Sequence, residues 1–322
     1  MKQKFRGRAA TASLFVTLGL LLAACSGSGV DQAATSTEDT ATTAECGEWN
    51  IAMHNWAGYT ASATIVSEVA KTELGCTINQ VPLTEAAVTY DAMEAGSVDV
   101  IIEDWGGGRW QPWVDRGAIQ VIGASIEEGL IGMYVPKWMA DKYPDITDSK
   151  NLNKYADLFK TPDSDGKGAW YEGPPGYTTI GEKMIEANNL NYKAINAGTE
   201  QALIDLFTDG QKNKKAVLGY WYEPQYFSKQ VELARITFPA NDWTNTADAS
   251  GLTDYPKTEL MVLATTKLVD SGSPFVTLLK NFKLTPEEQN TIAAEIAAKK
   301  DPVELAKEWI AANPDKVKAW LG

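Results

Sequence analysis

The sequence is rich in aromatic side chains, whose π faces can hold a cation. Eleven tryptophans and twelve tyrosines occur among 322 residues. A quaternary ammonium offers no hydrogen-bond donor, so a protein recognises it by shape and by π faces placed around the diffuse charge. Three or four such contacts, each worth roughly 0.5 to 2 kcal/mol, together with apolar burial approach the about −8 kcal/mol of micromolar binding. Core or helix packing is the alternative for any single ring, as at Trp49, Trp138, Trp309 and Trp320, so the positions of the others decide whether they form a cage.

Several of these aromatic residues stand where predicted strands end. Trp56 and Trp105 each follow one predicted strand, and Trp221 and Tyr222 follow another. Ligands of open α/β sheets bind at the carboxyl ends of the strands, so we expect these rings to project into one crevice. Tyr134 lies in a predicted connecting strand, where simple burial is the competing interpretation. The full set of candidate cage residues is Trp56, Trp105, Tyr134, Tyr177, Trp221 and Tyr222.

The segment before a predicted helix at 178–188 offers donors for an anion. A betaine carries a carboxylate beside its ammonium, and backbone N–H groups at a helix N-terminus bind anions. The amides of Gly176, Tyr177 and Thr178 would lie at this helix start. In the alternative interpretation Thr178 caps its own helix. The two roles are compatible.

Catalytic chemistry is hard to assemble from this sequence. His54 is the only histidine, and there is no nucleophile elbow, phosphate loop or His/Cys cluster with metal spacing. Glu103 and Asp104 are adjacent on a predicted strand, so their side chains point to opposite faces and make a poor glycosidase pair. The run from Asp163 to Gly166 lacks the later ligands of a calcium loop. We predict no enzyme activity, no cofactor and no metal site. A lipid-anchored hydrolase using Glu103 or Asp104 is the alternative.

Predicted strands and helices alternate in the first part of the chain. Strand-like apolar patterns occur at 49–56, 76–81 and 98–103. Between them, 60–74 and 84–95 carry apolar residues at helical spacing, each beginning at a threonine and followed by a glycine. This alternation predicts a parallel sheet covered by helices on both faces.

A second lobe is predicted after an apolar stretch at 130–135. The 277 residues that follow position 45 are long for one hydrophobic core and sufficient for two lobes. The amphipathic helices at 285–299 and 302–312 would return to pack on the first lobe. We expect lobe I at 46–132 and 244–322 and lobe II at 133–243.

Residues 1–24 have the pattern of an export signal. Four basic residues precede a short apolar stretch that ends directly before Cys25. The Leu-Ala-Ala-Cys sequence at this point resembles the bacterial lipobox, which implies a lipoprotein signal peptide, a lipidated Cys25 and an extracytoplasmic position on a bacterial membrane. An ordinary secretory signal is the alternative. Residues 25–45 contain almost no large apolar side chain, so they should form a flexible tether.

Cys46 and Cys76 remain as a pair once Cys25 is lipidated. Each lies at the start of a predicted strand, and adjacent parallel strands would place the two starts side by side, so a disulfide is expected in an oxidising exterior. Two buried free thiols are the alternative. Removing residues 1–24 takes away four positive and no negative side chains, which changes the formal charge from −13 to −17. Nucleic acid and anionic lipid are therefore poor partners, and we expect a monomer.

Several segments resemble the glycine betaine, proline betaine and choline binding proteins of ABC transporters, and the similarity covers 48–321. These segments are NWAGYTASAT at 55–64, AGSVDVIIEDW at 95–105, IGMYVPKWM at 131–139, GPPGYTTIGEKM at 173–184, GYWYEPQYF at 219–227 and WIAANPDKVKAWL at 309–321. The resemblance implies a two-lobed periplasmic-binding-protein-like α/β fold of type II, each lobe a mainly parallel sheet flanked by helices. It also implies capture of a small quaternary amine, such as glycine betaine, proline betaine, choline or a carnitine-like compound, and its delivery to an ABC permease in the membrane.

The resemblance also assigns cage residues position by position. Trp56 and Trp105 occupy family cage positions, and Tyr177 lies where a Pro-Gly segment supplies ligand contacts. Tyr222 aligns with the tryptophan of the family's Trp-x-Pro-His segment, which here reads YEPQ. Tyr222 therefore replaces the family's tryptophan, and Gln225 replaces its histidine. The identity of the ligand therefore stays open, and another zwitterion or a sugar is an alternative cargo.

Overall fold

The computed structural model of the protein describes residues 45–322, apart from 84, 85 and 244. The predicted signal peptide at 1–24, the predicted lipidation site Cys25 and the tether up to position 44 lie outside the described residues. In the part of the chain that is described, no helix combines the length and the apolar character that a membrane crossing requires.

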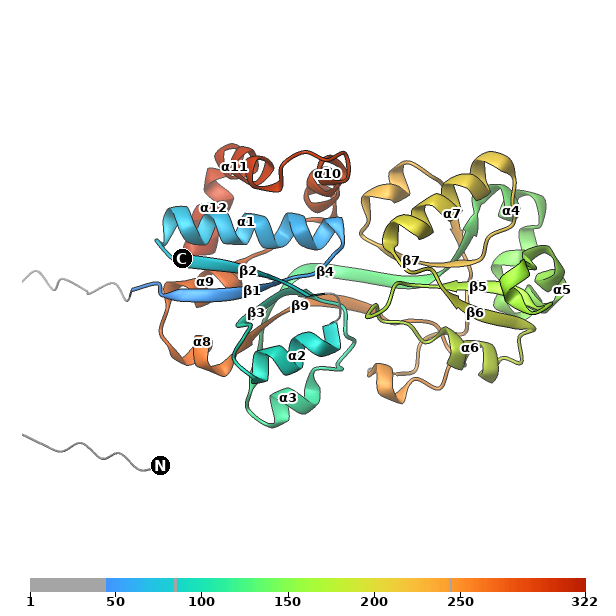
Figure 1. Ribbon diagram of the computed structural model, residues 1–322, viewed down its shortest axis with the longest axis horizontal. Helices are drawn as coiled ribbons and strands as arrows, with labels where there is room; N and C mark the ends of the chain where they lie inside the picture. The colour runs from blue at the N-terminus through green and yellow to red at the C-terminus, as the bar shows by residue number, and fades with distance from the viewer. Residues whose placement is uncertain (1–44, 84–85, 244) are drawn as a thin grey trace, which may run out of the picture. The chain divides into compact units, whose positions relative to one another are not determined.

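Three parallel strands form one end of the sheet. β1 (Glu48–Met53) lies between β2 (Thr77–Pro82) and β3 (Val100–Asp104) and is parallel to both. All residues of β3 are buried, as expected for a parallel strand that is covered on both faces. The crossover helices α1 (Ala57–Glu73) and α2 (Ala86–Glu94) lie on opposite faces of the sheet (Figure 1).

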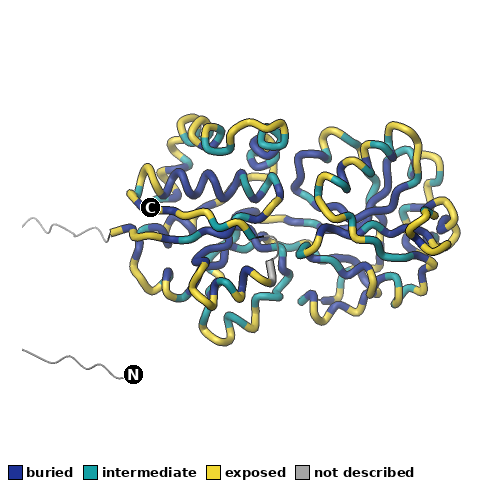
Figure 2. The backbone as a smooth tube through the Cα atoms, in the orientation of Figure 1, coloured by how far each residue is buried: buried dark blue, intermediate teal, exposed yellow. Residues whose placement is uncertain are grey.

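The first helix begins three residues earlier than the sequence predicts. The expected cap, Thr60, lies inside α1, and Trp56 occupies the N-cap position with an extended backbone (φ −111°, ψ 151°). α1 is buried along most of its length (Figure 2), because it packs on β1, β2 and β3 as well as on three later helices. The early start places Trp56 at the junction between β1 and α1.

Two long strands, β4 (Ile119–Pro136) and β9 (Lys257–Thr265), join the two halves of the sheet. β9 is antiparallel to β3 and to the first part of β4. The last part of β4 is antiparallel to β7 (Gly219–Glu223) and β8 (Leu233–Arg235). The sheet of the described chain has the order β2-β1-β3-β9-β4-β7-β5-β6, with β8 beside β4. The crossing strand is thus much longer than the predicted stretch at 130–135.

The other end of the sheet repeats the parallel arrangement. β5 (Gly168–Glu172) is parallel to both β7 and β6 (Tyr192–Asn196). α6 (Gly181–Ala187) connects β5 to β6, and α7 (Glu200–Asn213) connects β6 to β7. The hydroxyl of Thr199 caps α7 by accepting a hydrogen bond from the backbone N–H of Ala202. The local pattern of a threonine before an amphipathic run therefore sets the start of this helix.

The C-terminal helices return to the first end of the sheet. They are α9 (Pro274–Asn281), α10 (Pro286–Ala297), α11 (Pro302–Ala312) and α12 (Pro314–Leu321). Each begins with a proline, and the side chains of Ser273, Thr285 and Asp301 cap α9, α10 and α11. α10 and α11 pack on α1, and α12 packs on α9 (Figure 1).

The remaining helical elements are short. The α-helices are α3 (Gln111–Asp115), α4 (Lys137–Lys142), α5 (Leu152–Tyr155) and α8 (Thr266–Asp270). The 3-10 helices are η1 (Pro144–Thr147), η2 (Ser149–Asn151), η3 (Ala156–Phe159), η4 (Pro162–Ser164), η5 (Tyr226–Lys229) and η6 (Thr246–Asp248).

Two clusters of buried side chains form the cores of two lobes. The first cluster draws on β1, β3, α1 and the C-terminal helices, and the second on the end of β4, β5, β7 and α7. We call the parts around them the first and the second lobe. The predicted two-lobed α/β fold is confirmed, and the sheet is mixed because β4 and β9 are antiparallel to their neighbours. The exact lobe limits stay a prediction; Ala249 and Tyr255 belong to the second cluster.

Cys46 and Cys76 form a disulfide, with their Cα atoms 4.8 Å apart. Cys46 lies just before β1 and Cys76 just before β2, and the parallel register of these strands pairs Glu48 with Thr77. The bridge therefore joins the starts of two adjacent strands, as the sequence predicts.

Candidate ligand-binding site

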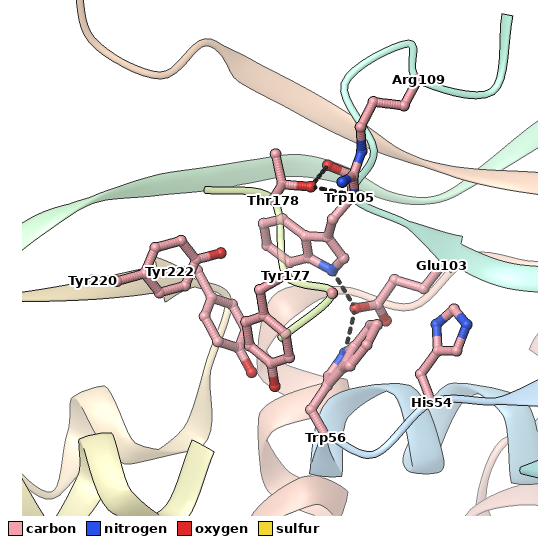
Figure 3. Close-up of a pocket in the computed structure, with 10 residues that line it drawn as sticks. His54, Trp56, Glu103, Trp105, Arg109, Tyr177, Thr178, Tyr220 and Tyr222 are labelled. Atoms are coloured by element: carbon pink, nitrogen blue, oxygen red, sulfur yellow. Dashed lines mark hydrogen bonds between the residues drawn. The ribbon is translucent and has the colours of Figure 1, made fainter. Parts of the chain in front are cut away.

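A cavity lies where side chains of the two lobes meet (Figure 3). Trp105 and Tyr177 pack against both core clusters. The cavity is narrow, with a free volume of about 20 Å³. The residues that line it are His54, Trp56, Glu103, Trp105, Arg109, Gly176, Tyr177, Thr178, Tyr220 and Tyr222.

Four of the predicted cage residues come together in this cavity. Trp56 follows β1 and Trp105 follows β3, both in the first lobe, whereas Tyr177 follows β5 and Tyr222 lies in β7. The ring centroids of Trp56 and Tyr177 are 5.5 Å apart and those of Trp105 and Tyr222 are 5.2 Å apart, each pair edge to face. Tyr177 also meets Tyr222 edge to face at 6.1 Å. Two indoles from one lobe thus oppose two phenols from the other.

The two indoles share one hydrogen-bond acceptor. Trp56 and Trp105 donate their Nε1–H groups to Oε1 of Glu103, at 3.2 and 2.8 Å. The other oxygen, Oε2, accepts from Nε2 of Gln289 at 2.5 Å and from the hydroxyl of Ser62 at 3.5 Å. Burial raises the pKa of Glu103, and the four donors act in the opposite direction. Glu103 therefore fixes the orientation of both rings.

Glu103 and Asp104 point to opposite faces of β3, as the sequence predicts. Asp104 accepts hydrogen bonds from the hydroxyl of Tyr90 and, at 2.8 Å, from the backbone N–H of Gly106. Among these two carboxylates only Glu103 lines the cavity. No group of three or more His, Cys, Asp or Glu side chains arranged to hold a metal ion occurs within the described residues.

Tyr222 is held from the second lobe by a partly buried carboxylate. Its hydroxyl donates to Oε1 of Glu200, which also accepts from Nε2 of Gln225 at 3.0 Å. Glu200 accepts a further hydrogen bond from the backbone of Ala57 at the start of α1. Burial raises the pKa of Glu200, whereas the hydrogen bonds from these three donors lower it. Gln225, which stands at the family's histidine position, is thus engaged with Glu200 and is absent from the cavity wall.

Two predicted cage residues lie outside the cavity wall. Trp221 is fully buried, packs on Phe207 and Phe227, and donates its Nε1–H to the hydroxyl of Ser228 at 3.2 Å. Adjacent residues of a strand face opposite sides, so Tyr222 faces the cavity and Trp221 faces the core. Tyr134 is buried in β4, where desolvation raises its pKa to about 12.

The segment from Gly176 to Thr178 lines the cavity but does not start a helix. α6 begins at Gly181, three residues later than the predicted helix. Gly176 has φ +87°, a value that favours glycine, and the N–H of Tyr177 already donates to the carbonyl of Pro174 at 3.1 Å. The predicted helix start at Thr178 is therefore wrong, and a turn engages the Tyr177 amide. Anion binding by this segment stays a prediction. The hydroxyl of Thr178 donates to the carbonyl of Trp105 at 2.8 Å rather than capping a helix.

The structure adds cavity residues that the sequence analysis did not select. His54 lies in the loop between β1 and α1; its Nε2 is 3.0 Å from the hydroxyl of Thr89, and its Nδ1 has no hydrogen-bond partner. Burial lowers the pKa of His54 to about 4, so its ring is neutral at neutral pH. Arg109 comes from a glycine-rich loop, and Tyr220 from β7. The one sequence feature that could have predicted His54 as a cavity residue is its position two residues before Trp56.

The chain is similar to known binding proteins over most of its length. Residues 48–312 match the family described as the substrate-binding domain of the ABC-type glycine betaine transport system. The trimethylamine N-oxide-binding protein of Pelagibacter ubique (strain HTCC1062) is 28% identical over 200 residues, which cover 59% of this chain and 62% of that protein. The match thus spans less than two thirds of that relative.

Solved structures share the fold at low sequence identity. An ABC-transporter choline-binding protein in complex with choline superposes with a TM-score of 0.71 and 17% identity, covering 86% of this chain and 92% of the other. Lactococcal OpuAC in its closed form with glycine betaine has a TM-score of 0.68 and 17% identity, covering 85% and 99%. The glycine betaine/L-proline-binding protein ProX from Borrelia burgdorferi has a TM-score of 0.69 and 16% identity, covering 85% and 97%.

These comparisons confirm the periplasmic-binding-protein-like fold and the family resemblance. The families and structures concerned are transport binding proteins rather than enzymes. Domains of this kind work outside the cytoplasm, where they pass a small solute to an ABC permease. The chain belongs to the family of substrate-binding domains of ABC-type glycine betaine transport systems.

Proposed function

We propose that the protein captures a small, fully methylated amine in an aromatic cage of Trp56, Trp105, Tyr177 and Tyr222. One observation carries the proposal. The indoles of Trp56 and Trp105 both donate to one oxygen of Glu103, and these two rings face Tyr177 and Tyr222 of the other lobe in the cavity. Fixed rings cost little ordering entropy when a ligand binds, so their π faces are available to a diffuse cation.

The electrostatics of the cavity support a cationic group. Burial raises the pKa of Tyr177 and Tyr222 well above the ordinary value, so both rings stay neutral phenols. The cavity wall also carries one carboxylate, Glu103, and one guanidinium, Arg109. A methylated ammonium would therefore meet π faces and a carboxylate, without a hydrogen-bond donor of its own to satisfy.

The cargo belongs to the betaine and choline class. Glycine betaine, choline and carnitine-like compounds carry a trimethylated nitrogen, and proline betaine carries a dimethylated ring nitrogen; aromatic cages hold cations of this kind. Trimethylamine N-oxide, named for the relative from Pelagibacter ubique, has the same methylated nitrogen. A sugar fits the site less well, because sugar sites need many amide and carboxylate partners beside their rings, whereas asparagine, glutamine and aspartate are absent from this cavity wall.

Closure of the lobes would follow from contacts that need both of them. The cage takes two rings from each lobe, so a ligand meets its full set of contacts only in the closed state. Such differential contact is what shifts a two-state protein toward the closed form. The closed complex would then dock on the permease and release the ligand.

The proposal is tested by calorimetric titration of the full-length protein. The ligand panel is glycine betaine, proline betaine, choline, carnitine, trimethylamine N-oxide and a disaccharide. At least one methylated amine should bind at micromolar or tighter affinity, and Trp105→Ala should weaken it at least about 30-fold through loss of cation–π contact and apolar burial. Trp309→Ala is the matched control, because Trp309 lies in α11 and stacks on Trp320.

Two outcomes would contradict the proposed cargo. One is binding of the disaccharide with no heat from any methylated amine. The other is equal loss of affinity in Trp105→Ala and Trp309→Ala, which would reduce the role of Trp105 to general stability.

We further propose that the mature protein is a monomer held on the membrane through a lipidated Cys25. The lipobox-like sequence before Cys25 supports this proposal, and two or more acyl chains make such anchoring stable. Cys25→Ser should move the protein from the membrane fraction to the soluble fraction. Recovery of the unchanged protein in the soluble fraction would contradict the anchor.

A further inference from the structure

Three consecutive glycines, Gly106 to Gly108, follow Trp105 in the loop after β3. The loop belongs to the first lobe, and the residues on either side of the glycines, Trp105 and Arg109, line the cavity. Gly107 and Gly108 have φ values of +54° and +81°, which favour glycine. The glycine run thus allows this backbone path and carries no side chain that would cover its carbonyl groups.

Four successive carbonyl groups of this loop accept hydrogen bonds from the second lobe. The bonds run from the Thr178 hydroxyl to Trp105 at 2.8 Å, and at 3.1 Å each from the Thr246 hydroxyl to Gly106, the Thr246 N–H to Gly107 and the Asn245 side-chain amide to Gly108. Figure 3 shows the first of them. We call this set of four bonds the interlobe strap.

The segment that carries Asn245 and Thr246 is fixed within the second lobe. Lys183, at the start of α6, donates its Nζ to the carbonyls of Ala247 and Ala249, at 3.2 Å each. Ala249 is part of the second core cluster, and the side chain of Asn245 caps η6 by accepting from the N–H of Ala247 at 2.9 Å. A movement of the second lobe therefore carries the strap donors with it.

Thr246 fits closely against the glycine run. A Cβ atom on Gly107 would lie only 2.7 Å from the Thr246 hydroxyl oxygen, so a side chain at this position would displace the donor. Thr246 is buried, and both its hydroxyl and its N–H donate to the first lobe. Separation of the lobes must break both bonds, and breaking hydrogen bonds between buried groups is unfavourable.

We propose that Asn245 and Thr246 are positioning residues of the binding site, which hold the loop of Trp105 in place in the closed protein and slow the release of the ligand. This inference rests on the proposed function of the aromatic cage. Neither residue lines the cavity, so both act through the loop and not on the ligand. Their bonds join the two lobes and therefore stabilise the closed state relative to the open one, which lowers the dissociation rate.

The test measures ligand association and dissociation by stopped-flow tryptophan fluorescence of the full-length protein, with glycine betaine, choline and trimethylamine N-oxide as probes. Thr246→Val removes the hydroxyl and keeps the backbone N–H and nearly the same shape. Asn245→Asp removes the amide that donates to Gly108 and keeps the oxygen that caps η6. Each variant should raise the dissociation rate constant about 3- to 10-fold, the range of one hydrogen bond, and leave the association rate constant within about twofold.

The factor should be the same for every probe that the unchanged protein binds, because the strap does not touch the ligand. Thr266→Val is the matched control: the hydroxyl of Thr266 also donates to a glycine carbonyl, that of Gly117 at 2.7 Å, but both residues belong to the first lobe. This variant should leave both rate constants unchanged. Hydrogen exchange gives a second measurement, since a bound probe should slow the exchange of the Thr246 amide, which donates to the other lobe.

Several results would overturn the inference. Unchanged dissociation in both strap variants, or an equal increase in Thr266→Val, would leave the strap no role in ligand release. An effect on association alone would place the role of these residues in the open protein, and an effect on one probe alone would place them against the ligand. Binding of no probe by the unchanged protein would refute the proposed function itself, and the inference with it. Thermal unfolding of each variant, measured in parallel, shows that a change in rate arises in the folded protein.

Discussion

Gln289, in α10, donates its side-chain amide to the Glu103 carboxylate at 2.5 Å, although the two residues are 186 positions apart. Gln289 is buried and also donates to the hydroxyl of Ser62 at 3.0 Å and to the carbonyl of Gly58 at 3.2 Å. The C-terminal helices therefore help to fix the carboxylate on which both cage indoles depend.

Glu103→Ala should damage both the stability and the cage. The change leaves the indole N–H groups of Trp56 and Trp105 without their acceptor, and unpaired buried donors cost about 1 to 3 kcal/mol each. We expect the free energy of unfolding to fall by about 3 kcal/mol and ligand affinity to fall at least about tenfold, measured by urea denaturation and calorimetry. Glu127→Ala, which removes an exposed carboxylate paired with Lys283, should change neither. Full affinity in Glu103→Ala would refute the orienting role.

Trp221→Phe should lower the stability of the protein, whereas Tyr222→Ala should lower its affinity for the ligand. Trp221 is buried against Phe207 and Phe227, so Trp221→Phe should lower the free energy of unfolding by about 2 kcal/mol while affinity stays within about threefold. Tyr222 lines the cavity, so Tyr222→Ala should reduce affinity at least about tenfold. Urea denaturation and titration of both variants measure the contrast. Equal affinity losses would place the ligand against Trp221 as well.

The stability of the protein should depend on pH through Glu172, at the end of β5. Glu172 is 7% exposed, and burial raises its pKa from the ordinary 4.5 to about 7. A hydrogen bond from Nε1 of Trp170, at 2.7 Å, acts in the opposite direction and lowers this pKa. Between these pKa values the folded protein keeps a proton that the unfolded chain has released. The contribution of Glu172 to stability is therefore complete below about pH 4.5 and is lost as the pH rises through about 7.

Denaturant unfolding at pH 5 and pH 7.5 checks this dependence. From the lower to the higher pH, the unchanged protein should lose about 2 kcal/mol of stability relative to Glu172→Gln, which cannot titrate. Glu186→Gln, an exposed change in the neighbouring α6, serves as the control and should follow the unchanged protein. Identical pH profiles for the unchanged protein and Glu172→Gln would contradict the assignment.

The disulfide between Cys46 and Cys76 should stabilise the fold without shaping the cage. The two cysteines are 30 positions apart, and closing a loop of that length contributes about 3 to 4 kcal/mol on the chain-entropy model. The double variant Cys46→Ser with Cys76→Ser should lose that amount in urea denaturation. Its ligand affinity should stay within about threefold, because neither cysteine lines the cavity. A large loss of affinity at full stability would reverse this interpretation.

The sequence by itself determined the features that depend on local spacing. Trp56 and Trp105 could be assigned to strand ends, because a short stretch of sequence is enough to identify a buried strand and the residue that follows it. The alternation of side chains along a strand likewise placed Glu103 and Asp104 on opposite faces. The same alternation separated Trp221 from Tyr222, but it did not say which of them faces the cavity.

Only the tertiary structure decided the contacts made by residues far apart in the chain. Arg109 lies in a glycine-rich loop without periodicity, and Gln289 reaches Glu103 through the packing of α10 on α1. The turn at Gly176 and the later start of α6 leave the segment from Gly176 to Thr178 on the cavity wall but outside any helix. A loop conformation or a long-range hydrogen bond depends on how the whole chain packs, whereas strand and helix patterns follow from the spacing of neighbouring side chains.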